Sequence, residues 1–167
     1  NTAIYGGGIY VTNGKAYLYN SILHQNHAYD SGGAMNVYSG NITIEGCTFS
    51  VNSAQDSGGG INCERSSTLT IVDSILMKNS ANEYGGVIFA TDDSVLKMSR
   101  NNFSDNIAAL SGGLLYSEKG GDYTFTNCFS TNNSANIAGG SLFISDNFEL
   151  LIFKTSFIKD SAKDINA

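Results

Sequence analysis

The sequence predicts an all-β protein, a right-handed parallel β-helix of about six coils with 26–27 residues in each coil. Three observations predict it: a recurring glycine pair, an asparagine and an alanine at fixed distances before it, and two stretches per unit that alternate between apolar and polar residues. A repeat of about 20–50 residues indicates a solenoid or a related architecture. Alternation with a period of two indicates strands, and no segment keeps a helical apolar period, so we expect minimal helix.

The glycine pairs mark one corner of each unit. They are Gly6-Gly7, Gly32-Gly33, Gly58-Gly59, Gly85-Gly86, Gly112-Gly113 and Gly139-Gly140, at spacings of 26, 26, 27, 27 and 27 residues. Glycine adopts positive φ easily and fits where a side chain would clash. The pairs therefore predict a tight turn at the same place in every coil.

An asparagine stands six residues before each pair except the first, and an alanine follows two residues after that asparagine. The asparagines are Asn26, Asn52, Asn79, Asn106 and Asn133, and the alanines are Ala28, Ala54, Ala81, Ala108 and Ala135. Asp160 and Ala162 continue the two series, which Asn1 and Ala3 begin. Stacked asparagines can form an amide ladder, and asparagine tolerates left-handed turns. Alanine suits a bend with little room.

Two strands are expected in each unit. The first follows the glycine pair, at Ile9–Val11, Met35–Val37, Ile61–Cys63, Ile88–Ala90, Leu115–Ser117 and Leu142–Ile144. The second carries inward residues at Ile42 and Ile44, Leu69 and Ile71, Leu96 and Met98, Tyr123 and Phe125, and Leu150 and Ile152. Turn-forming residues such as Thr12-Asn13-Gly14 and Ser39-Gly40-Asn41 separate the two strands.

A large apolar residue ends the second strand, three residues before the asparagine: Leu23, Phe49, Leu76, Phe103 and, before Asp160, Phe157. In the fifth unit Phe129 lies three residues before Asn132 instead of Asn133, which predicts a one-residue insertion in that coil. One such unit cannot bury its apolar stripe alone. Stacked units pair equivalent strands in parallel and form a continuous core, and parallel crossovers favour the right hand.

Residues 1–167 are expected to form one domain, a segment of a longer solenoid. The first residues resemble the end of a repeat that is already under way. Both ends of the stack would expose unpaired strand edges, which natural proteins cover. We therefore expect further coils, caps or a neighbouring protein at each end.

The composition excludes some classes of function. The formal net charge is −6, and the nine Lys and Arg residues are scattered, so we expect no nucleic-acid partner. No apolar run approaches the length of a membrane-spanning helix. An acidic, Asn- and Ser-rich surface suits an extracellular or cell-surface protein. Cys47, Cys63 and Cys128 are too few and too irregular for a disulfide framework or a zinc site.

These motifs resemble the repeats of the chlamydial polymorphic outer membrane proteins, which are defined by GGAI-like and FxxN tetrapeptides. The first type stands here as Gly32-Gly33-Ala34-Met35 and Gly85-Gly86-Val87-Ile88, and the second as Phe49–Asn52, Phe103–Asn106 and Phe129–Asn132. Similar repeats occur in large surface proteins of ciliates and other protists. The resemblance implies a pectin-lyase-like β-helix, a cell-surface location and a role in adhesion or surface architecture. It implies no catalytic residue. We expect no cofactor, with calcium as the one alternative.

Three acids share one column, two residues before successive glycine pairs: Asp30, Asp56 and Glu83. Adjacent coils would place them about 5 Å apart, so a cation such as calcium could be bound between them. The alternative is solvated carboxylates at an exposed turn. No His, Lys or Arg shares the column, so a polysaccharide lyase or hydrolase is the least favoured interpretation.

Aromatic residues recur at the outward position of the first strand, at Tyr10, Phe89, Tyr116 and Phe143, and Val87 and Leu114 are expected to extend this apolar face. An exposed apolar face indicates a contact with a partner chain or a neighbouring lobe. It also suits the faces of sugars, so a glycan is an alternative ligand. A third interpretation is a strand-favouring surface without a partner.

The remaining candidates are of several kinds. Cys47 and Cys128 fall in one inward column and are expected to be buried free thiols, too far apart to bond. His24 and His27 flank Asn26 at a turn and are expected to be surface residues. Glycosylation sequons occur at Asn41, Asn102 and Asn132, of which Asn41 is the best placed because it lies at a turn.

Together these patterns predict an extracellular or cell-surface structural or adhesive module that is not an enzyme, a possible building block of a fibre or appendage. The first alternative is an adhesin module that binds a glycan or a receptor.

Overall fold

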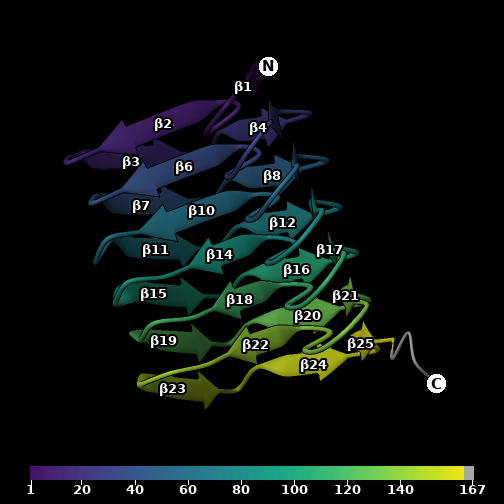
Figure 1. Ribbon diagram of the computed structural model, residues 1–167. Coiled ribbons are helices and arrows are strands. Elements are labelled where there is room, and N and C mark those ends of the chain that lie inside the picture. The colour runs from purple at the N-terminus through teal and green to yellow at the C-terminus, as the bar shows by residue number, and fades with distance from the viewer. Residues whose placement is uncertain (164–167) are drawn as a thin grey trace.

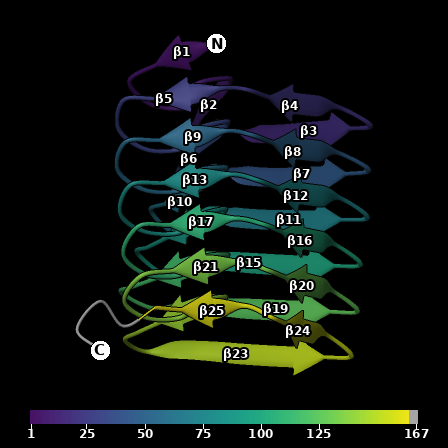
Figure 2. The same cartoon turned by 90° about the vertical axis from the view of Figure 1, so that its right-hand side faces the viewer.

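The computed structural model describes residues 1–163 and is a parallel β-helix of about six coils (Figure 1). Equivalent strands of successive coils lie side by side in four parallel sheets, and the two described ends of the chain lie at opposite ends of the stack (Figure 2). Over the described range the secondary structure is strand and turn, and it includes no helix that is long and apolar enough to cross a membrane. The predicted fold is confirmed.

The chain passes through sheets A, B, C and D in turn in every coil. Sheet A consists of β1 (Thr2–Ala3), β5 (His27–Ala28), β9 (Ser53–Ala54), β13 (Ser80–Ala81), β17 (Ile107–Ala108), β21 (Ser134–Ala135) and β25 (Ser161–Ala162). Sheet B consists of β2 (Ile9–Thr12), β6 (Met35–Tyr38), β10 (Ile61–Glu64), β14 (Ile88–Ala90), β18 (Leu115–Ser117) and β22 (Leu142–Ile144).

Sheet C, which has the longest strands, consists of β3 (Lys15–Tyr19), β7 (Asn41–Glu45), β11 (Thr68–Val72), β15 (Ser94–Ser99), β19 (Gly121–Thr126) and β23 (Phe148–Phe153). Sheet D consists of β4 (Ile22–His24), β8 (Thr48–Ser50), β12 (Ile75–Met77), β16 (Asn102–Ser104), β20 (Phe129–Thr131) and β24 (Ser156–Ile158). The prediction of two strands per coil was therefore too low. Strands of two or three residues are too short to show a visible alternation.

Four corners turn the chain in each coil, and each corner contains a residue with positive φ. Between sheets D and A these residues are Gln25, Val51, Lys78, Asp105, Asn132 and Lys159; between C and D they are Asn20, Gly46, Asp73, Arg100, Asn127 and Lys154. Between A and B the corner residue is the first glycine of each pair, with φ from 59° at Gly6 to 74° at Gly32. Most non-glycine corner residues are polar, in keeping with the left-handed preference of Asn and Asp.

The second glycine of each pair is required because another coil passes directly beside it. A Cβ atom on Gly86 would lie inside van der Waals contact with the carbonyl oxygen of Gly113 and with the backbone of Ile107. Both obstacles are backbone atoms of the next coil, which cannot rotate away. The glycine pair is thus the tight corner that the repeat predicts.

The core is a continuous column inside the four sheets. The register aligns Ile44 with Ile71 and Ile71 with Met98, and all three are at most 1% exposed. Val87 and Leu114 belong to this core at 0% exposure, so their predicted place on the outer face was wrong. The N–H groups of Val87 and Ile88 both donate to the carbonyl oxygen of Leu114. This shared acceptor interrupts the strand alternation, so two successive residues face inward.

The asparagine column forms the expected ladder. Nδ2 of Asn52 donates to Oδ1 of Asn79 at 2.9 Å, and the backbone N–H of Asn52 donates to the same oxygen at 3.1 Å. The second Nδ2 hydrogen of Asn52 reaches the carbonyl oxygen of Leu23 at 2.9 Å. The same pattern continues to Asp160, whose Oδ1 accepts the backbone N–H of Asn133 at 2.7 Å.

The predicted insertion in the fifth coil is wrong. The register pairs Phe103 with Ser130, and Ser130 with Phe157, so Ser130 takes the inward position and Phe129 points outward at 42% exposure. Ser130 is 1% exposed, and its hydroxyl donates to Oδ2 of Asp160 at 2.7 Å. A hydrogen bond to the end of the asparagine ladder therefore lets a serine occupy a core position.

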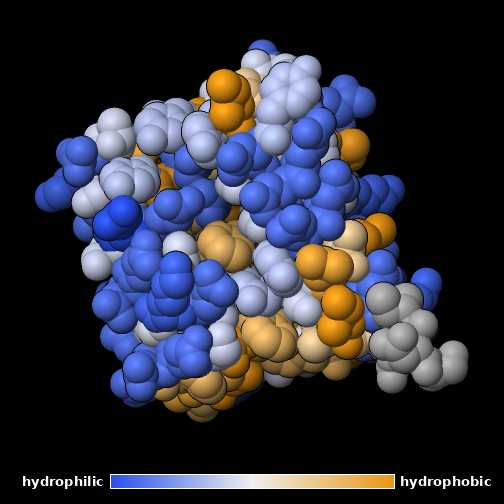
Figure 3. Space-filling model, viewed as in Figure 1, coloured by the Kyte–Doolittle hydropathy of each residue, from blue (hydrophilic) through white to orange (hydrophobic). Residues whose placement is uncertain are grey.

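The last described coil exposes its inward side chains. Leu150, Ile152 and Phe157 are 36–42% exposed, whereas their equivalents in the middle coils are almost fully buried. Figure 3 shows the hydrophobic surface gathered at this end of the molecule, with a mostly hydrophilic surface above it. The expectation that further coils, a cap or a neighbour covers each end stays a prediction.

Candidate binding surfaces

The predicted acid column lies at the corner between sheets A and B. The N–H of Asp56 donates to the carbonyl oxygen of Asp30, and the N–H of Glu83 to that of Asp56, both at 3.0 Å, so the three acids are on adjacent coils. The hydroxyls of Ser31 and Ser57 donate to Asp30 and Asp56 at 3.0 and 2.9 Å. The carboxylate of Asp56 raises the pKa of Glu83, because like charges on neighbouring coils repel.

The three acids follow the axis of the stack rather than surrounding one point. Among residues 1–163 no group of three or more His, Cys, Asp or Glu side chains is arranged to hold a metal ion. Protein calcium sites use about six to eight oxygen ligands around the ion. Calcium at Asp30, Asp56 and Glu83 therefore stays a prediction, without a converging ligand set to support it.

Three of the four predicted aromatic residues stack on one another along the outer face of sheet B. The ring centroids of Phe89 and Tyr116 are 5.6 Å apart and those of Tyr116 and Phe143 are 4.8 Å apart, with planes within 4° in both pairs. Tyr84 packs on Tyr116 at 4.3 Å. Burial raises the pKa of Tyr116 to about 12, and its side chain is 9% exposed. Because the rings cover each other's faces, a partner would meet mainly their edges.

Tyr10, the fourth predicted residue, lies apart from these three. In the outward column of sheet B it is separated from Phe89 by Asn36 and Asn62. It is 51% exposed. The predicted partner-binding face is thus divided into a stacked aromatic part and a separate region around Tyr10.

The region around Tyr10 is a hollow of about 270 Å³, lined by Tyr5, Tyr10, Asp30, Asn36, Tyr38 and Glu64. We call it the tyrosine hollow. Its residues come from three coils: Tyr5 precedes β2, Tyr10 is in β2, Asn36 and Tyr38 are in β6, and Glu64 is in β10. Asp30 supplies the acidic edge and connects the hollow to the acid column.

Carboxylates dominate the electrostatics of the tyrosine hollow. The charge of Asp30, followed by a hydrogen bond to the same carboxylate, raises the pKa of the Tyr5 phenol, and Glu64 adds to the effect. Oε1 of Glu64 accepts a hydrogen bond from Nδ2 of Asn62 at 2.5 Å, which fixes the carboxylate over β10. The lining contains no Lys, Arg or His.

Sequence reasoning identified Tyr10 and Asp30 but not the hollow. Tyr5 lies outside the predicted strands, and Tyr38 and Glu64 each lie one position beyond them. The available signal was that Tyr38 and Glu64 lie two residues after Asn36 and Asn62. In a strand they therefore share the outer face with Tyr10.

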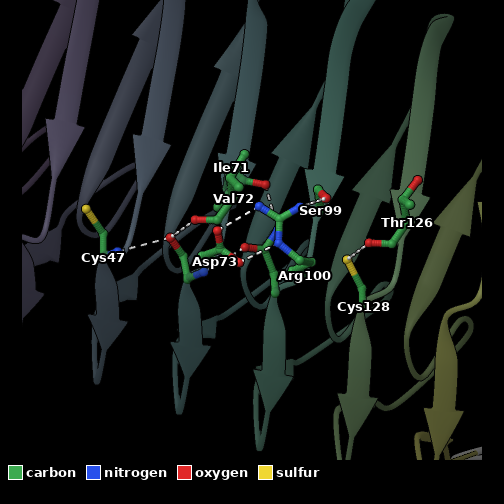
Figure 4. Close-up of polar contacts among 10 residues, drawn as sticks. Cys47, Ile71, Val72, Asp73, Ser99, Arg100, Thr126 and Cys128 are labelled. Carbon is green, nitrogen blue, oxygen red and sulfur yellow. Dashed lines mark hydrogen bonds and ion pairs between the residues drawn. The ribbon is translucent and has the colours of Figure 1, made fainter.

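A second buried polar column runs between sheets C and D, and Figure 4 shows part of it. The N–H of Cys47 donates to Oγ of Ser74 at 3.0 Å, and the N–H of Ser74 donates to Oδ1 of Asn101 at 2.9 Å. Cys47, Cys63 and Cys128 are all buried and free, which was predicted for Cys47 and Cys128. Burial raises the pKa of Cys63 to about 12, which keeps it as an unreactive thiol.

An exposed ion pair lies beside this column (Figure 4). Nε and Nη2 of Arg100 donate to the two carboxylate oxygens of Asp73, both at 2.7 Å. These bonds lower the pKa of Asp73. The pair joins adjacent corners between sheets C and D and offers no free charge to a ligand.

The two histidines contact serines of the next coil. Nδ1 of His24 lies 2.9 Å from Oγ of Ser50, and Nδ1 of His27 lies 2.9 Å from Oγ of Ser53. Neither pair is arranged with a carboxylate in a metal-binding group within residues 1–163. These contacts connect adjacent coils, so a structural role accounts for both histidines.

The asparagines of the three sequons are all exposed. Asn41, at the start of β7, and Asn102, at the start of β16, are exposed. Asn132 is also exposed and lies in a left-handed corner, where its Nδ2 donates to Oδ1 of Asp105 at 3.3 Å. Glycosylation at any of them stays a prediction.

Comparisons with known proteins support the fold. A family model described as "Right handed beta helix region" matches residues 1–130 of the 167. A search of curated proteins and a search of solved structures each found no similar protein.

Proposed function

Because the chain belongs to the right-handed β-helix family, we propose that it is a structural or adhesive module that acts at a cell surface or outside the cell. The observation that carries this proposal is the unbroken pairing along the stack. Four parallel sheets and the buried asparagine ladder connect every described coil to the next. Such an arrangement resists bending and suits a spacer.

The dimensions support a rod-like role. The seven strands of sheet A span about 29 Å at a spacing of about 4.8 Å. Solenoid repeats contact only their neighbours, so the lateral faces of the rod stay free to meet other molecules. A surface fibre or appendage built from such modules would use both properties.

Antibody labelling of intact source cells tests the location. Antibodies raised against the folded chain should label cells that have not been permeabilised, and protease treatment of intact cells should remove the signal. Labelling that appears only after permeabilisation would contradict the proposal.

A second candidate function is a receptor- or glycan-binding adhesin, and the tyrosine hollow favours it. The hollow joins exposed tyrosine rings to hydrogen-bonding groups on the lateral face of the rod. Beads coated with the chain should then adhere to cells or matrix, and Tyr10→Ala should reduce adhesion. Equal adhesion of the variant would leave the purely structural role as the better account.

We propose no catalytic role. In the described part of the chain Arg65, Arg100 and Lys119 form ion pairs with Asp73, Asp92 and Glu118 and not with the acids of the column. A lyase or hydrolase needs an acid and a base close to one bond. Incubation with polygalacturonate, with and without calcium, should release no unsaturated or reducing products. Release that depends on Asp56 would reverse this assignment.

A further inference from the structure

The tyrosine hollow holds two carboxylates without a cationic partner. The ion pairs formed by residues 1–163 involve Asp73, Asp92 and Glu118, and none involves Asp30 or Glu64. Asp56 and Glu83 continue the negative charge along the stack. A region of one charge sign attracts ligands of the opposite sign and accelerates their association.

The rings of the hollow can receive a cation. The Arg65 guanidinium carbon lies 5.5 Å from the centroid of the Tyr38 ring, so one ring already carries a cation of this kind. Tyr5 and Tyr10 are 47% and 51% exposed. Guanidinium and ammonium groups bind over such rings and gain more as water is removed.

Asn36 adds a hydrogen-bond donor that a bare cation would not use. Its side chain is 4% exposed and lines the hollow. Its Oδ1 accepts from Nδ2 of Asn62 at 2.9 Å, whereas its own Nδ2 has no acceptor among residues 1–163. This nitrogen is not fully enclosed by protein atoms, so a ligand in the hollow can reach it. A ligand that brings an oxygen, such as a peptide carbonyl, would satisfy it.

We propose that the tyrosine hollow binds a basic segment of a partner polypeptide. The arginine or lysine head group of the partner pairs with Asp30 and Glu64. Its aliphatic stem lies along Tyr5 and Tyr10, and a backbone carbonyl of the segment accepts the Asn36 amide hydrogen. This site does not depend on where the chain is located or on whether it forms a fibre.

An NMR titration of the full chain tests the proposal with three probes. The probes are acetyl-Gly-Arg-Gly-amide, the same peptide with neutral citrulline in place of arginine, and ethylguanidinium, which has the cationic head group but no carbonyl. We expect the arginine peptide to shift the Asn36 side-chain amide and the backbone signals of β2, β6 and β10, with affinity that falls as salt is added. The citrulline peptide should bind at least about 10-fold more weakly.

Two variants with matched controls locate the site. In Glu64→Gln the new side chain can still accept the hydrogen bond from Asn62, and the affinity for the arginine peptide should fall about 5- to 10-fold. The control is Glu45→Gln, which changes an exposed acid on sheet C and should leave this affinity unchanged. Tyr10→Ala should weaken binding several-fold, and Tyr17→Ala, which removes a 62% exposed ring from sheet C, should not. The unshifted signals of the other coils report that each variant is folded.

The outcomes separate the alternatives. Ethylguanidinium that binds as tightly as the peptide would overturn the peptide contact through Asn36. Equal binding of the citrulline peptide, or no shift at the hollow, would overturn the proposal as a whole. If N-acetylglucosamine or galactose shifts the signals of the hollow and the arginine peptide does not, the hollow binds a saccharide and the proposal is overturned.

Discussion

The left-handed corner residues are where single side chains affect the fold most directly. Val51 is the one β-branched residue among the non-glycine residues of positive φ in residues 1–163, with φ 57°. A β-branched side chain in this conformation is strained by about 1–2 kcal/mol. Val51→Asn should therefore raise the free energy of unfolding by about 1 kcal/mol, measured by urea denaturation.

The control for Val51 is Val72→Asn, which makes the same replacement at a half-buried strand position in β11. Asparagine is disfavoured in strands, so this change should lower stability. A Val51→Asn variant that is no more stable than the original chain would show that the corner is not strained.

The asparagine ladder should tolerate no interruption. Oδ1 of Asn79 accepts from the backbone N–H and Nδ2 of Asn52, and its Nδ2 donates to the Phe49 carbonyl and to Asn106. Asn79→Ala leaves several buried groups unpaired and should cost at least about 3 kcal/mol by urea denaturation. Asn102→Ala, at an exposed position, should change stability by less than about 0.5 kcal/mol. Similar costs for both variants would contradict the ladder's importance.

The acid column makes stability depend on pH. Asp56 raises the pKa of Glu83, so the folded state holds this proton more tightly than the unfolded state does. The contribution of Glu83 to stability is complete below the unfolded pKa of about 4.5 and is lost as pH rises through the folded pKa.

Glu83→Gln should therefore raise the Tm at pH 7, and the gain should disappear below about pH 4 and shrink in high salt. Glu45→Gln, which removes an exposed acid near Arg100, should give no such gain. Equal shifts in Tm at both pH values would show that repulsion along the column is not the cause.

At the scale of the element, the turn between sheets A and B sets how closely coils approach. Gly86→Ala places a methyl group against the backbone of the next coil and should cost more than about 2 kcal/mol. Gly14→Ala has its nearest obstacle 3.6 Å away and should change stability by less than about 0.5 kcal/mol. Circular dichroism melts of the two variants compare them. If Gly86→Ala matches the original Tm, the corner has more room than the structure shows.

The elements that the sequence predicts best are those that repeat with a visible alternation. The strands of sheets B and C and their inward residues follow directly from the columns, as with Leu69 and Ile71. Sheet A was missed because two residues cannot display a period. Sheet D was missed because its apolar residues, such as Phe49, were assigned to the end of the preceding strand, although a left-handed corner at Gly46 separates the two. Val87 and Phe129 were misplaced for different reasons. A shared backbone acceptor turns Val87 inward, and Ser130 takes the inward position beside Phe129; neither change alters the repeat.

The candidate sites were predictable only where they follow a single column. Asp30, Asp56 and Glu83 share a column and were found, and so were the stacked aromatics. The tyrosine hollow combines several columns from three coils, so only the register and the turns bring Tyr5 and Glu64 together. A periodic sequence thus reveals sites that follow one column of the repeat more readily than sites that combine several columns.

At the scale of the whole molecule, the structure is a stack in which each coil is stabilised by the coils on either side. The core, the asparagine ladder and the cysteine-containing column run through adjacent coils without a break between units. Solenoids of this kind lose stability mainly where a coil lacks a neighbour. Leu150, Ile152 and Phe157 are exposed in the last described coil, so this coil gains most if a further coil or a partner covers it.

Contacts between residues one coil apart test the central claim most directly. In a nuclear Overhauser experiment the stacked structure predicts cross-peaks between the backbones of Ile44 and Ile71 and of Ile71 and Met98, which are paired in parallel. It also predicts that the side-chain amide protons of Asn52, Asn79 and Asn106 exchange slowly with water. Absence of these cross-peaks, together with rapid exchange at the three asparagines, would contradict the stacking of equivalent residues.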